Sequence, residues 1–230
     1  MGELAQATKT AEPITYAGRL DPLASGVCVL LSGEQRHQKE DYLKLDKEYY
    51  LTVVFGIQTD TLDPLGIITQ TDKTEKVITE KQVKKALADF SPTYQQTPPR
   101  YSSVPIKGQP SFTYAKKDLP DSPPAREVSI KKSELIEVTT ITKQELITSS
   151  VERVQLVRGD FRQPETIAGW KNTAAKLPEK LFVCKLRVTC TSGTYMRSLA
   201  RDLGEKLNTP AMALRIMRSR VGDFTLPFQE

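Results

Sequence analysis

Residues 17–27, with the sequence AGRLDPLASGV, are the most informative stretch of the chain. They place Asp21 directly before a proline and then pass through small residues and a glycine into the apolar run 26–32. Proline fixes its own backbone torsion φ, so this pattern predicts a loop that presents the Asp21 carboxylate beside rigid backbone. Taken alone, the pattern fits a turn aspartate better than a catalytic one.

Length and composition exclude several classes of protein. The chain has 230 residues, 38% hydrophobic and 27% charged, which is ample for one core and unlike a fibrous or disordered chain. The longest apolar stretch, 27–31, is far shorter than the roughly 20 residues of a membrane-spanning helix, and the first residues lack a signal sequence. We therefore expect a cytoplasmic, monomeric protein that does not associate with membranes and forms a single domain over residues 1–230.

The residue types available limit the chemistry. The chain has one histidine, His37, and three separated cysteines, Cys28, Cys184 and Cys190, which by themselves form neither a disulfide framework nor a zinc site. Chemistry must rest on carboxylates, hydroxyls, tyrosine, lysine or arginine, and we expect no bound metal. The net charge of +5 is a mild indication of a polyanionic partner, although many basic proteins bind no nucleic acid.

Hydrophobic periodicity indicates an α+β protein in which extended segments outnumber helices. Residues 26–32 and 49–56 are β-favouring runs of buried-strand length and are expected to be central strands. In residues 182–190, apolar and polar residues alternate, which predicts a strand with one buried face. Further strands are expected over residues 128–138 and 151–157.

Helices are fewer but better marked. Thr79 and Gln82 form a capping-box pattern before apolar residues at helical spacing. From Thr194 onward, apolar residues recur on one stripe, with Arg197 and Arg201 lying off it. Short helices are expected over residues 167–175 and 211–217, and proline-rich loops over residues 95–99 and 118–124.

Residues 17–27 resemble the aspartate motif of the pseudouridine synthases, in particular the TruB family, which modifies the T arm of tRNA. The family motif G-x-L-D-P-L-A-x-G-V is present here as Gly18, Leu20, Asp21, Pro22, Leu23, Ala24, Gly26 and Val27. Arg19 completes a Gly-Arg-Leu-Asp stretch that is also similar to the small-subunit rRNA pseudouridine synthases.

Further motifs of this family follow in order along the chain. Residues 46–66 resemble a K-x-Y strand followed by T-D-T-x-D-x-x-G, and residues 98–116 resemble P-P-x-Y-S-A…G…Y-A-R. Residues 192–204 resemble G-T-Y-I-R-x-L-x-x-D-L-G, and residues 218–222 resemble R-T-R-V-G. The resemblance extends from about residue 16 to 224. It implies the pseudouridine synthase catalytic fold, with a mixed, largely antiparallel sheet flanked by helices and loops.

The resemblance implies isomerisation of uridine to pseudouridine in RNA, with the T-loop uridine of tRNA as the expected substrate. The reaction breaks the N-glycosidic bond, turns the base over and joins C5 to C1′, so it requires no redox change, metal or cofactor. Asp21 is implied as the nucleophile, Arg197 as its charge-assisted hydrogen-bond partner, and Tyr49 as the tyrosine that stacks on the target base. Attack on the sugar, attack on the base and glycal formation all remain open as routes.

Other residues are implied as substrate contacts. Tyr16 aligns with a family histidine that fills the gap left by the flipped base, and Ile216 with an apolar residue that packs against that base. Tyr195, within the fourth motif, is a further expected contact. Candidate phosphate contacts are Arg19, Arg100, Lys107, Lys116, Arg201 and Arg218.

Two segments have no catalytic assignment. Residues 59–63 lack the ligand pattern of a calcium loop, so turn and capping roles are expected for their aspartates. Residues 157–162, followed by Trp170, resemble a segment of some short bacterial TruB-like proteins, and the sequence assigns them no role.

The chain departs from the family at both ends. Residues 1–14 match neither the K-P-x-G-x-(T/S)-S segment nor the helix that precede the aspartate motif, and the few residues after 224 leave no room for a C-terminal PUA domain. A catalytically impaired tRNA-binding or RNA-folding protein of the same family is therefore the alternative. A carboxylate-pair glycoside hydrolase ranks last, because no second motif carboxylate accompanies Asp21.

Overall fold

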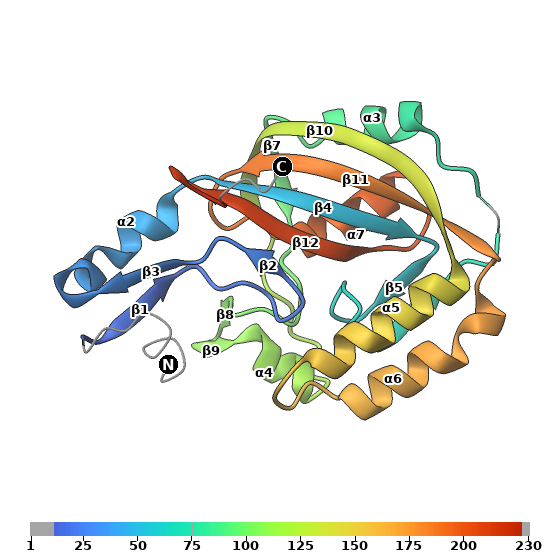
Figure 1. The fold of residues 1–230 in the computed structure, drawn as a ribbon, viewed down its shortest axis with the longest axis horizontal. Coiled ribbons are helices and arrows are strands. Elements are labelled where there is room, and N and C mark those ends of the chain that lie inside the picture. Colours follow the sequence, from blue (N-terminus) through green and yellow to red (C-terminus); the bar gives the residue numbers. More distant parts are fainter. Residues whose placement is uncertain (1–11, 75, 227–230) are drawn as a thin grey trace.

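The computed structural model describes residues 12–74 and 76–226. Within these ranges, the centre of the molecule is a seven-stranded sheet. Its strands are β2 (Ser25–Gly26), β4 (Lys47–Phe55), β7 (Thr93–Gln96), β10 (Arg126–Thr142), β11 (Lys180–Cys190), β12 (Ala211–Val221) and β13 (Phe224–Thr225). The order is β13-β12-β4-β11-β10-β7, with β2 paired to β12 (Figure 1).

Smaller elements surround this sheet. Two-stranded sheets pair β1 (Ile14–Ala17) with β3 (Val29–Ser32), β5 (Ile57–Thr59) with β6 (Ile68–Thr71), and β8 (Pro105–Ile106) with β9 (Gln109–Pro110). The helices are η1 (Gly33–Gln38), α2 (Lys39–Lys44), α3 (Glu80–Ala88), α4 (Ser111–Lys116), α5 (Lys143–Leu156), α6 (Gln163–Asn172), η2 (Ala174–Lys176) and α7 (Met196–Lys206). Within the described part of the chain, every helix is too short or too polar to cross a membrane.

The large sheet is mixed and largely antiparallel, as predicted. β2 runs parallel to β12, whereas β4 pairs antiparallel with both β11 and β12. Helices flank the sheet on both sides, so the α+β fold class is confirmed.

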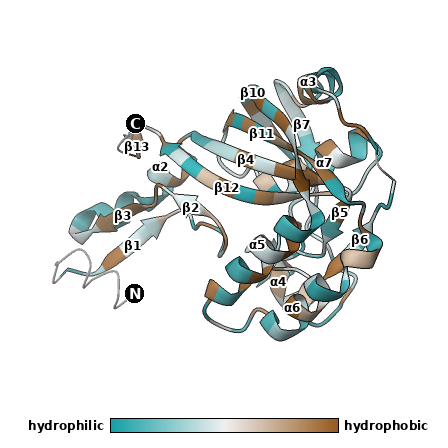
Figure 2. Ribbon diagram, turned by 45° about the vertical axis from the view of Figure 1, so that its right-hand side comes forward, coloured by the Kyte–Doolittle hydropathy of each residue, from teal (hydrophilic) through white to brown (hydrophobic). Residues whose placement is uncertain are grey.

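Each face of the sheet carries its own hydrophobic core. Helices α3 and α7 cover one face, around buried residues such as Leu51, Leu186 and Leu203. Helices α5 and α6 cover the other, around Val54 and Trp170. Figure 2 shows hydrophobic segments recurring along β10, β11 and β12, while α5 and α6 alternate hydrophobic and hydrophilic residues. The sheet is therefore the middle of three layers.

Several predicted elements are confirmed. Cys184, Leu186, Val188 and Cys190 of β11 all face the α3/α7 core, as their alternation predicts. Helix α3 begins with the predicted capping box, in which the Thr79 amide donates to Gln82 Oε1 at 2.9 Å. The apolar stripe of α7 is also buried.

Two segments adopt the opposite secondary structure from the one predicted. Residues 151–157 lie mainly in α5 and are not a strand, because a capping box at Thr142 and Glu145 starts a helix upstream. Residues 211–217 lie in strand β12 and are not a helix. Ala211, Met212, Ala213 and Leu214 are all buried, so both faces of the strand are apolar and the period of two is lost.

Other elements have bounds that differ from the predicted ones. Residues 26–32 form the end of β2 and all of β3, and β3 pairs with β1 outside the large sheet, so this run is not a central strand. Helix α6 begins at Gln163, before the predicted start at 167. Residues 95 and 96 belong to β7 rather than to a loop.

Gly26 and Gly169 offer a matched test of this architecture. At Gly26, φ is +112° and an added Cβ would lie 2.1 Å from the carbonyl oxygen of Arg218 on β12, whereas at Gly169 in α6 an added Cβ meets nothing within 4 Å. We expect Gly26→Ala to lower the free energy of unfolding by about 2 to 3 kcal/mol. We expect Gly169→Ala to raise it by up to about 1 kcal/mol. Urea denaturation measures both, and equal stabilities would contradict the close approach of β2 to β12.

Candidate active site

Asp21 and Arg197 meet although 176 residues separate them in the sequence. Arg197 Nε donates to Asp21 Oδ2 at 2.9 Å, and Arg197 Nη2 donates to Asp21 Oδ1 at 2.7 Å. The side chain of Arg197 is 5% exposed and that of Asp21 is 31% exposed. This is a bidentate, charge-assisted pair in which the guanidinium is enclosed and the carboxylate is open on one side.

Two backbone carbonyls hold the same guanidinium from other directions. Arg197 Nη1 donates to the carbonyl oxygen of Thr61 at 2.8 Å, and Nη2 donates to that of Tyr101 at 3.1 Å. Burial lowers the pKa of Arg197, but the charges of Asp21 and Asp63 and the hydrogen bonds to Asp21 together outweigh burial, and the pKa is raised. The guanidinium therefore stays charged and has a fixed orientation.

The loop that follows β5 supplies one of these carbonyls and a second carboxylate. Asp63 Oδ1 accepts hydrogen bonds from Thr61 Oγ1 at 2.6 Å and from the Leu65 amide at 2.9 Å, which is the predicted turn role. Asp63 Oδ2 also lies 3.8 Å from Arg197 Nε, a contact that sequence reasoning missed. In the two described ranges, no three His, Cys, Asp or Glu side chains gather closely enough to hold a metal ion.

Arg218 holds the loop that carries Asp21. Its Nε donates to the carbonyl of Val27 at 2.8 Å, and its Nη2 donates to the carbonyl of Gly18 at 3.0 Å, so one guanidinium joins both ends of the loop. Arg218 is only 2% exposed. The prediction that Arg218 contacts an RNA phosphate therefore does not fit its position, and a structural role in shaping the loop does.

Tyr49 and Ile216 lie on the sheet beside this loop. In the pairing of β4 with β12, Tyr49 is opposite Arg218, and Leu51 is opposite Ile216. Tyr49 and Ile216 both pack with the α3/α7 core. Burial raises the pKa of Tyr49 to about 12, and the negative charge of Asp21 adds to the rise. Tyr49 is thus a neutral phenol within electrostatic reach of Asp21.

The remaining predicted contacts form two separate groups. Tyr16 lies in β1, and its hydroxyl accepts a hydrogen bond from Arg19 Nε at 2.5 Å. Tyr195 is the N-cap residue of α7, and its backbone amide donates to Gln96 Oε1 at 2.8 Å. The guanidinium of Arg126 lies 5.1 Å from the centre of the Tyr195 ring. The structure therefore brings Tyr195 to the helix that carries Arg197.

Most of the other candidate phosphate contacts already have partners within the chain. Lys107 is 2.9 Å from Asp121, and Lys116 is 3.5 Å from Asp160. Arg100 donates to the carbonyl of Leu119, and Arg201 donates to the carboxylate of Asp202. The two lysine pairs are exposed, so RNA phosphates could replace their partners at little cost.

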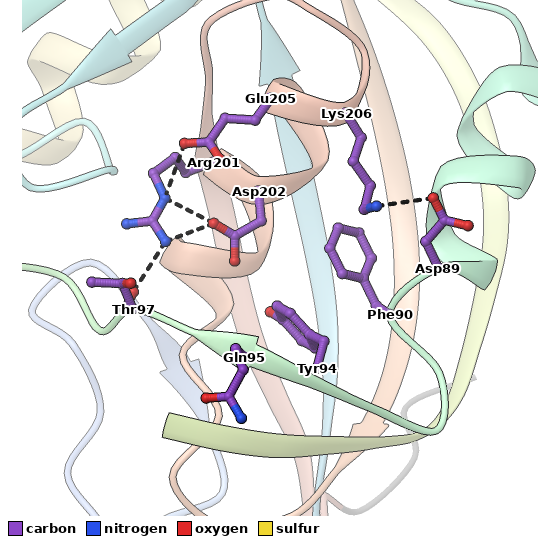
Figure 3. A pocket seen from close by; sticks show the side chains of 9 residues that line it. All are labelled: Asp89, Phe90, Tyr94, Gln95, Thr97, Arg201, Asp202, Glu205 and Lys206. Atoms are coloured by element: carbon purple, nitrogen blue, oxygen red, sulfur yellow. Dashed lines mark hydrogen bonds and ion pairs between the residues drawn. The ribbon is translucent and has the colours of Figure 1, made fainter. Parts of the chain in front are cut away.

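A cavity of about 710 Å³, lined by neither Asp21 nor Arg197, lies between the end of α3, β7 and the second half of α7 (Figure 3). It is lined by Asp89, Phe90, Tyr94, Gln95, Thr97, Arg201, Asp202, Glu205 and Lys206. Its basic groups are paired: Arg201 binds Asp202, and Lys206 is 2.9 Å from Asp89. Arg201 also donates to the carbonyl of Thr97 at 3.1 Å, which supports the segment leading to Tyr101.

Comparison with known proteins decides the family. A family model described as the N-terminal domain of TruB family pseudouridylate synthase matches residues 6–153, more than half of the chain. The chain belongs to the TruB family. The match begins inside the segment 1–14 that was predicted to be unmatched, and residues 1–11 of that segment lie outside the described residues.

Curated TruB-family relatives cover nearly all of the chain. The tRNA pseudouridine synthase B of Phocaeicola vulgatus is 31% identical over 213 residues, which are 93% of this chain and 73% of that protein. The tRNA pseudouridine synthase B of Syntrophus aciditrophicus is 33% identical over 211 residues, which are 92% of this chain and 54% of that protein. The chain thus spans only about half the length of some of the curated relatives it matches.

Solved structures share the TruB-family fold at low sequence identity. A chain from a structure described as a Cbf5-Nop10-Gar1 complex superposes with a TM-score of 0.58 at 17% identity, over 98% of this chain and 45% of that chain. A second, from a structure of an H/ACA RNP bound to a substrate RNA containing 2′-deoxyuridine, gives a TM-score of 0.54 at 15% identity. These similarities establish the fold.

The phenol of Tyr49 gives a pH-dependent prediction. Its pKa of about 12 in the folded chain exceeds the ordinary value of 10, so between these values the folded chain keeps a proton that the unfolded chain loses. The corresponding stability is complete below pH 10 and is lost as the pH rises toward 12. We expect Tyr49→Phe to reduce the fall in the free energy of unfolding across this window by about 1 to 3 kcal/mol. Urea denaturation at several alkaline pH values measures this, and an unchanged fall would show that the phenol is not shielded.

Proposed function

We propose that this chain isomerises uridine to pseudouridine in RNA, with the T-loop uridine of tRNA as substrate and Asp21 as nucleophile. The observation that carries the proposal is the bidentate Asp21–Arg197 pair, whose two members lie on two separate family motifs. Curated relatives that cover more than nine-tenths of the chain are named tRNA pseudouridine synthase B, which supports the same activity.

Asp21 suits the nucleophilic role because one side of its carboxylate is open while Arg197 fixes the other. By attack on the sugar, attack on the base or formation of a glycal, the carboxylate promotes cleavage of the N1–C1′ bond, and it is free again when C5 joins C1′. C5 loses its hydrogen and N1 gains one, so the product has the same atoms as the substrate. Arg197 keeps the carboxylate oriented throughout, through its buried, planar fork.

The neighbours of Asp21 provide a place for the base. A uridine inside a folded loop must leave its stack to reach a carboxylate on the protein. Tyr49 supplies an aromatic face and a neutral hydroxyl, and Ile216 supplies an apolar contact on the same face of the sheet. Tyr16, whose hydroxyl is bound by Arg19, supplies a ring that can fill the gap in the RNA.

The geometry favours this enzyme over the two alternatives. A glycoside hydrolase needs a second carboxyl group across the scissile bond, but Asp63 is 4% exposed, is bound by Thr61 and Leu65, and lies against Arg197. A catalytically impaired tRNA-binding protein would not require an oriented Asp21 carboxylate. Isomerase activity is the test that separates the enzyme from that protein.

Asp21→Asn should separate chemistry from binding. The amide keeps the shape of the carboxylate but loses its nucleophilic oxygen, so we expect pseudouridine formation to fall by at least about 10³-fold while tRNA affinity stays within a few-fold. The measurements are chemical mapping of pseudouridine in an unmodified tRNA transcript and filter binding. Asp223→Asn, at an exposed turn, is the matched control.

The wild-type chain and Asp21→Asn together distinguish an active enzyme from the RNA-binding alternative. If both bind tRNA equally and neither makes pseudouridine, the chain is the RNA-binding alternative. If Asp21→Asn keeps near wild-type isomerisation of the T-loop uridine, Asp21 is not the nucleophile.

Arg197→Lys tests the orientation of the carboxylate. Lysine keeps the charge but loses the fork that spans both oxygens of Asp21 and reaches the carbonyls of Thr61 and Tyr101. We expect kcat to fall by about 10²-fold or more with little change in KM. Arg215→Lys, at an exposed position of β12, should change neither. Single-turnover kinetics checks this, and a loss confined to KM would instead make Arg197 a substrate-binding residue.

A further inference from the structure

Helices α5 and α6 form a hairpin, residues 143–172, between β10 and β11. It covers the face of the sheet opposite α7 (Figure 1). It contains residues 157–162 and Trp170, the segment to which the sequence assigns no role. The contacts of the hairpin with the loops around Arg197 indicate a role in positioning.

Arg162 binds the loop that follows β5. Its Nη1 donates to Asp60 Oδ2 at 2.8 Å, and its Nη2 donates to Asp60 Oδ1 at 3.2 Å. Asp60 Oδ1 also accepts from the Ile67 amide at 2.8 Å, which closes the loop. The next residue after Asp60 is Thr61, whose carbonyl holds Arg197.

Arg162 also contacts the second segment that holds Arg197. Its guanidinium lies 4.7 Å from the centre of the Tyr101 ring, and the carbonyl of Tyr101 accepts from Arg197 Nη2. One side chain thus bridges the two segments whose carbonyls fix the guanidinium of Arg197. Arg162 itself has a φ of +59°, a strained conformation for a residue with a side chain. Such strain persists where the surroundings enforce it.

Other residues of the hairpin hold the same surroundings. Trp170 Nε1 donates to the carbonyl of Pro64 at 2.9 Å, and Thr166 Oγ1 donates to the carbonyl of Leu65 at 3.2 Å. Arg153 Nη2 donates to the carbonyl of Leu23, two residues after Asp21, at 2.8 Å. The hairpin therefore contacts the loops on both sides of the Asp21–Arg197 pair.

We propose that the α5–α6 hairpin positions the Asp21–Arg197 pair, and that Arg162 is its principal positioning residue. The expected effect on kcat rests on the proposed function, whereas the expected effect on the orientation of Arg197 does not. Without Arg162, Arg197 itself is left to bridge the segments at Thr61 and Tyr101, so these segments move more freely and Arg197 gains freedom to rotate away from Asp21. A displacement of about 1 Å at a reacting group costs about 10²-fold in rate.

If Arg162 contributed only to overall stability, its substitution would lower the melting temperature without a specific change at Arg197. The side chains of Arg162 and Asp60 are 29% and 24% exposed, so water can take over part of their ion pair, and its loss costs less stability than the loss of a fully buried pair. Trp170 is fully buried, and its removal would damage the core. Substitution of Arg162 can therefore disturb the site while the fold survives.

The experiment compares Arg162→Ala, Arg162→Lys and Asp60→Asn with Lys171→Ala, an exposed position of α6, as the control. The first readout is hydrogen exchange at the Nε–H of Arg197, followed by NMR in the RNA-free chain and assigned by its loss in Arg197→Lys. The second is kcat and KM for an unmodified tRNA transcript. The third is the melting temperature.

We expect Arg162→Ala to speed exchange at Arg197 Nε by at least about tenfold and to lower kcat about 10- to 100-fold, with KM within about threefold. Arg162→Lys should recover part of this loss, because it keeps the charge facing Asp60. Asp60→Asn should give the same direction of change, which keeps the test available if Arg162→Ala fails to fold. Lys171→Ala should match the wild type in all three readouts.

Three results would overturn or redirect the conclusion. Wild-type exchange and wild-type kcat in Arg162→Ala would refute positioning by Arg162. A change in KM alone would refute it too, since Arg162 would then be a substrate contact. If the wild-type chain makes no pseudouridine, the proposed function fails, and exchange at Arg197 alone decides whether the hairpin positions the pair.

Discussion

The guanidinium of Arg197 is a buried charge, and the arrangement of the surrounding loops follows from what that charge requires. Its side chain is 5% exposed, so water cannot satisfy its donors. Asp21 supplies the opposite charge, and carbonyls from the segments at Thr61 and Tyr101 supply further acceptors. A charge buried this deeply needs an opposite charge beside it and an acceptor for its donors. Three segments far apart in the sequence are thereby tied to the first turn of α7.

The central sheet explains how these segments come together. β4 lies between β11 and β12, and β11 leads directly into α7, so Arg197 emerges beside the strand pair that carries Tyr49 and Ile216. The Asp21 loop reaches the same place because β2 runs alongside β12, where Gly26 lets the two backbones approach closely. Strand pairing therefore brings these residues to one region of the fold, and the hydrogen bonds of the arginines fix the orientation of the loops there.

Sequence patterns predicted the structure of β11 and α7 and missed that of residues 211–217. The alternation from Cys184 to Cys190 in β11 and the stripe of α7 gave the correct structure because these residues pack one face on the α3/α7 core. Residues 211–214 contribute to both cores, so their unbroken apolar run carried no period of two and suggested a helix. The pairing of Asp21 with Arg197 came from motif resemblance. Nothing local predicted the burial of Arg197, which lies off the apolar stripe, or the contact of Asp63 with it, because both depend on loops remote in the sequence.

The arginines of this chain change what its net charge of +5 implies about RNA binding. Arg153, Arg197 and Arg218 all donate to backbone carbonyls of loops around Asp21, and none of these guanidinium groups faces freely outward. A planar fork with five donors suits this task, since it can satisfy several carbonyls at once where a lysine could satisfy fewer in fixed directions. Because these positive charges hold the loops of the site, they are not available to a polyanion. Any attraction for a polyanion must come from other basic residues. Arg19, within the Asp21 loop, is one that is exposed. Burial, rather than position in the sequence, thus decides which arginines remain available to a polyanion.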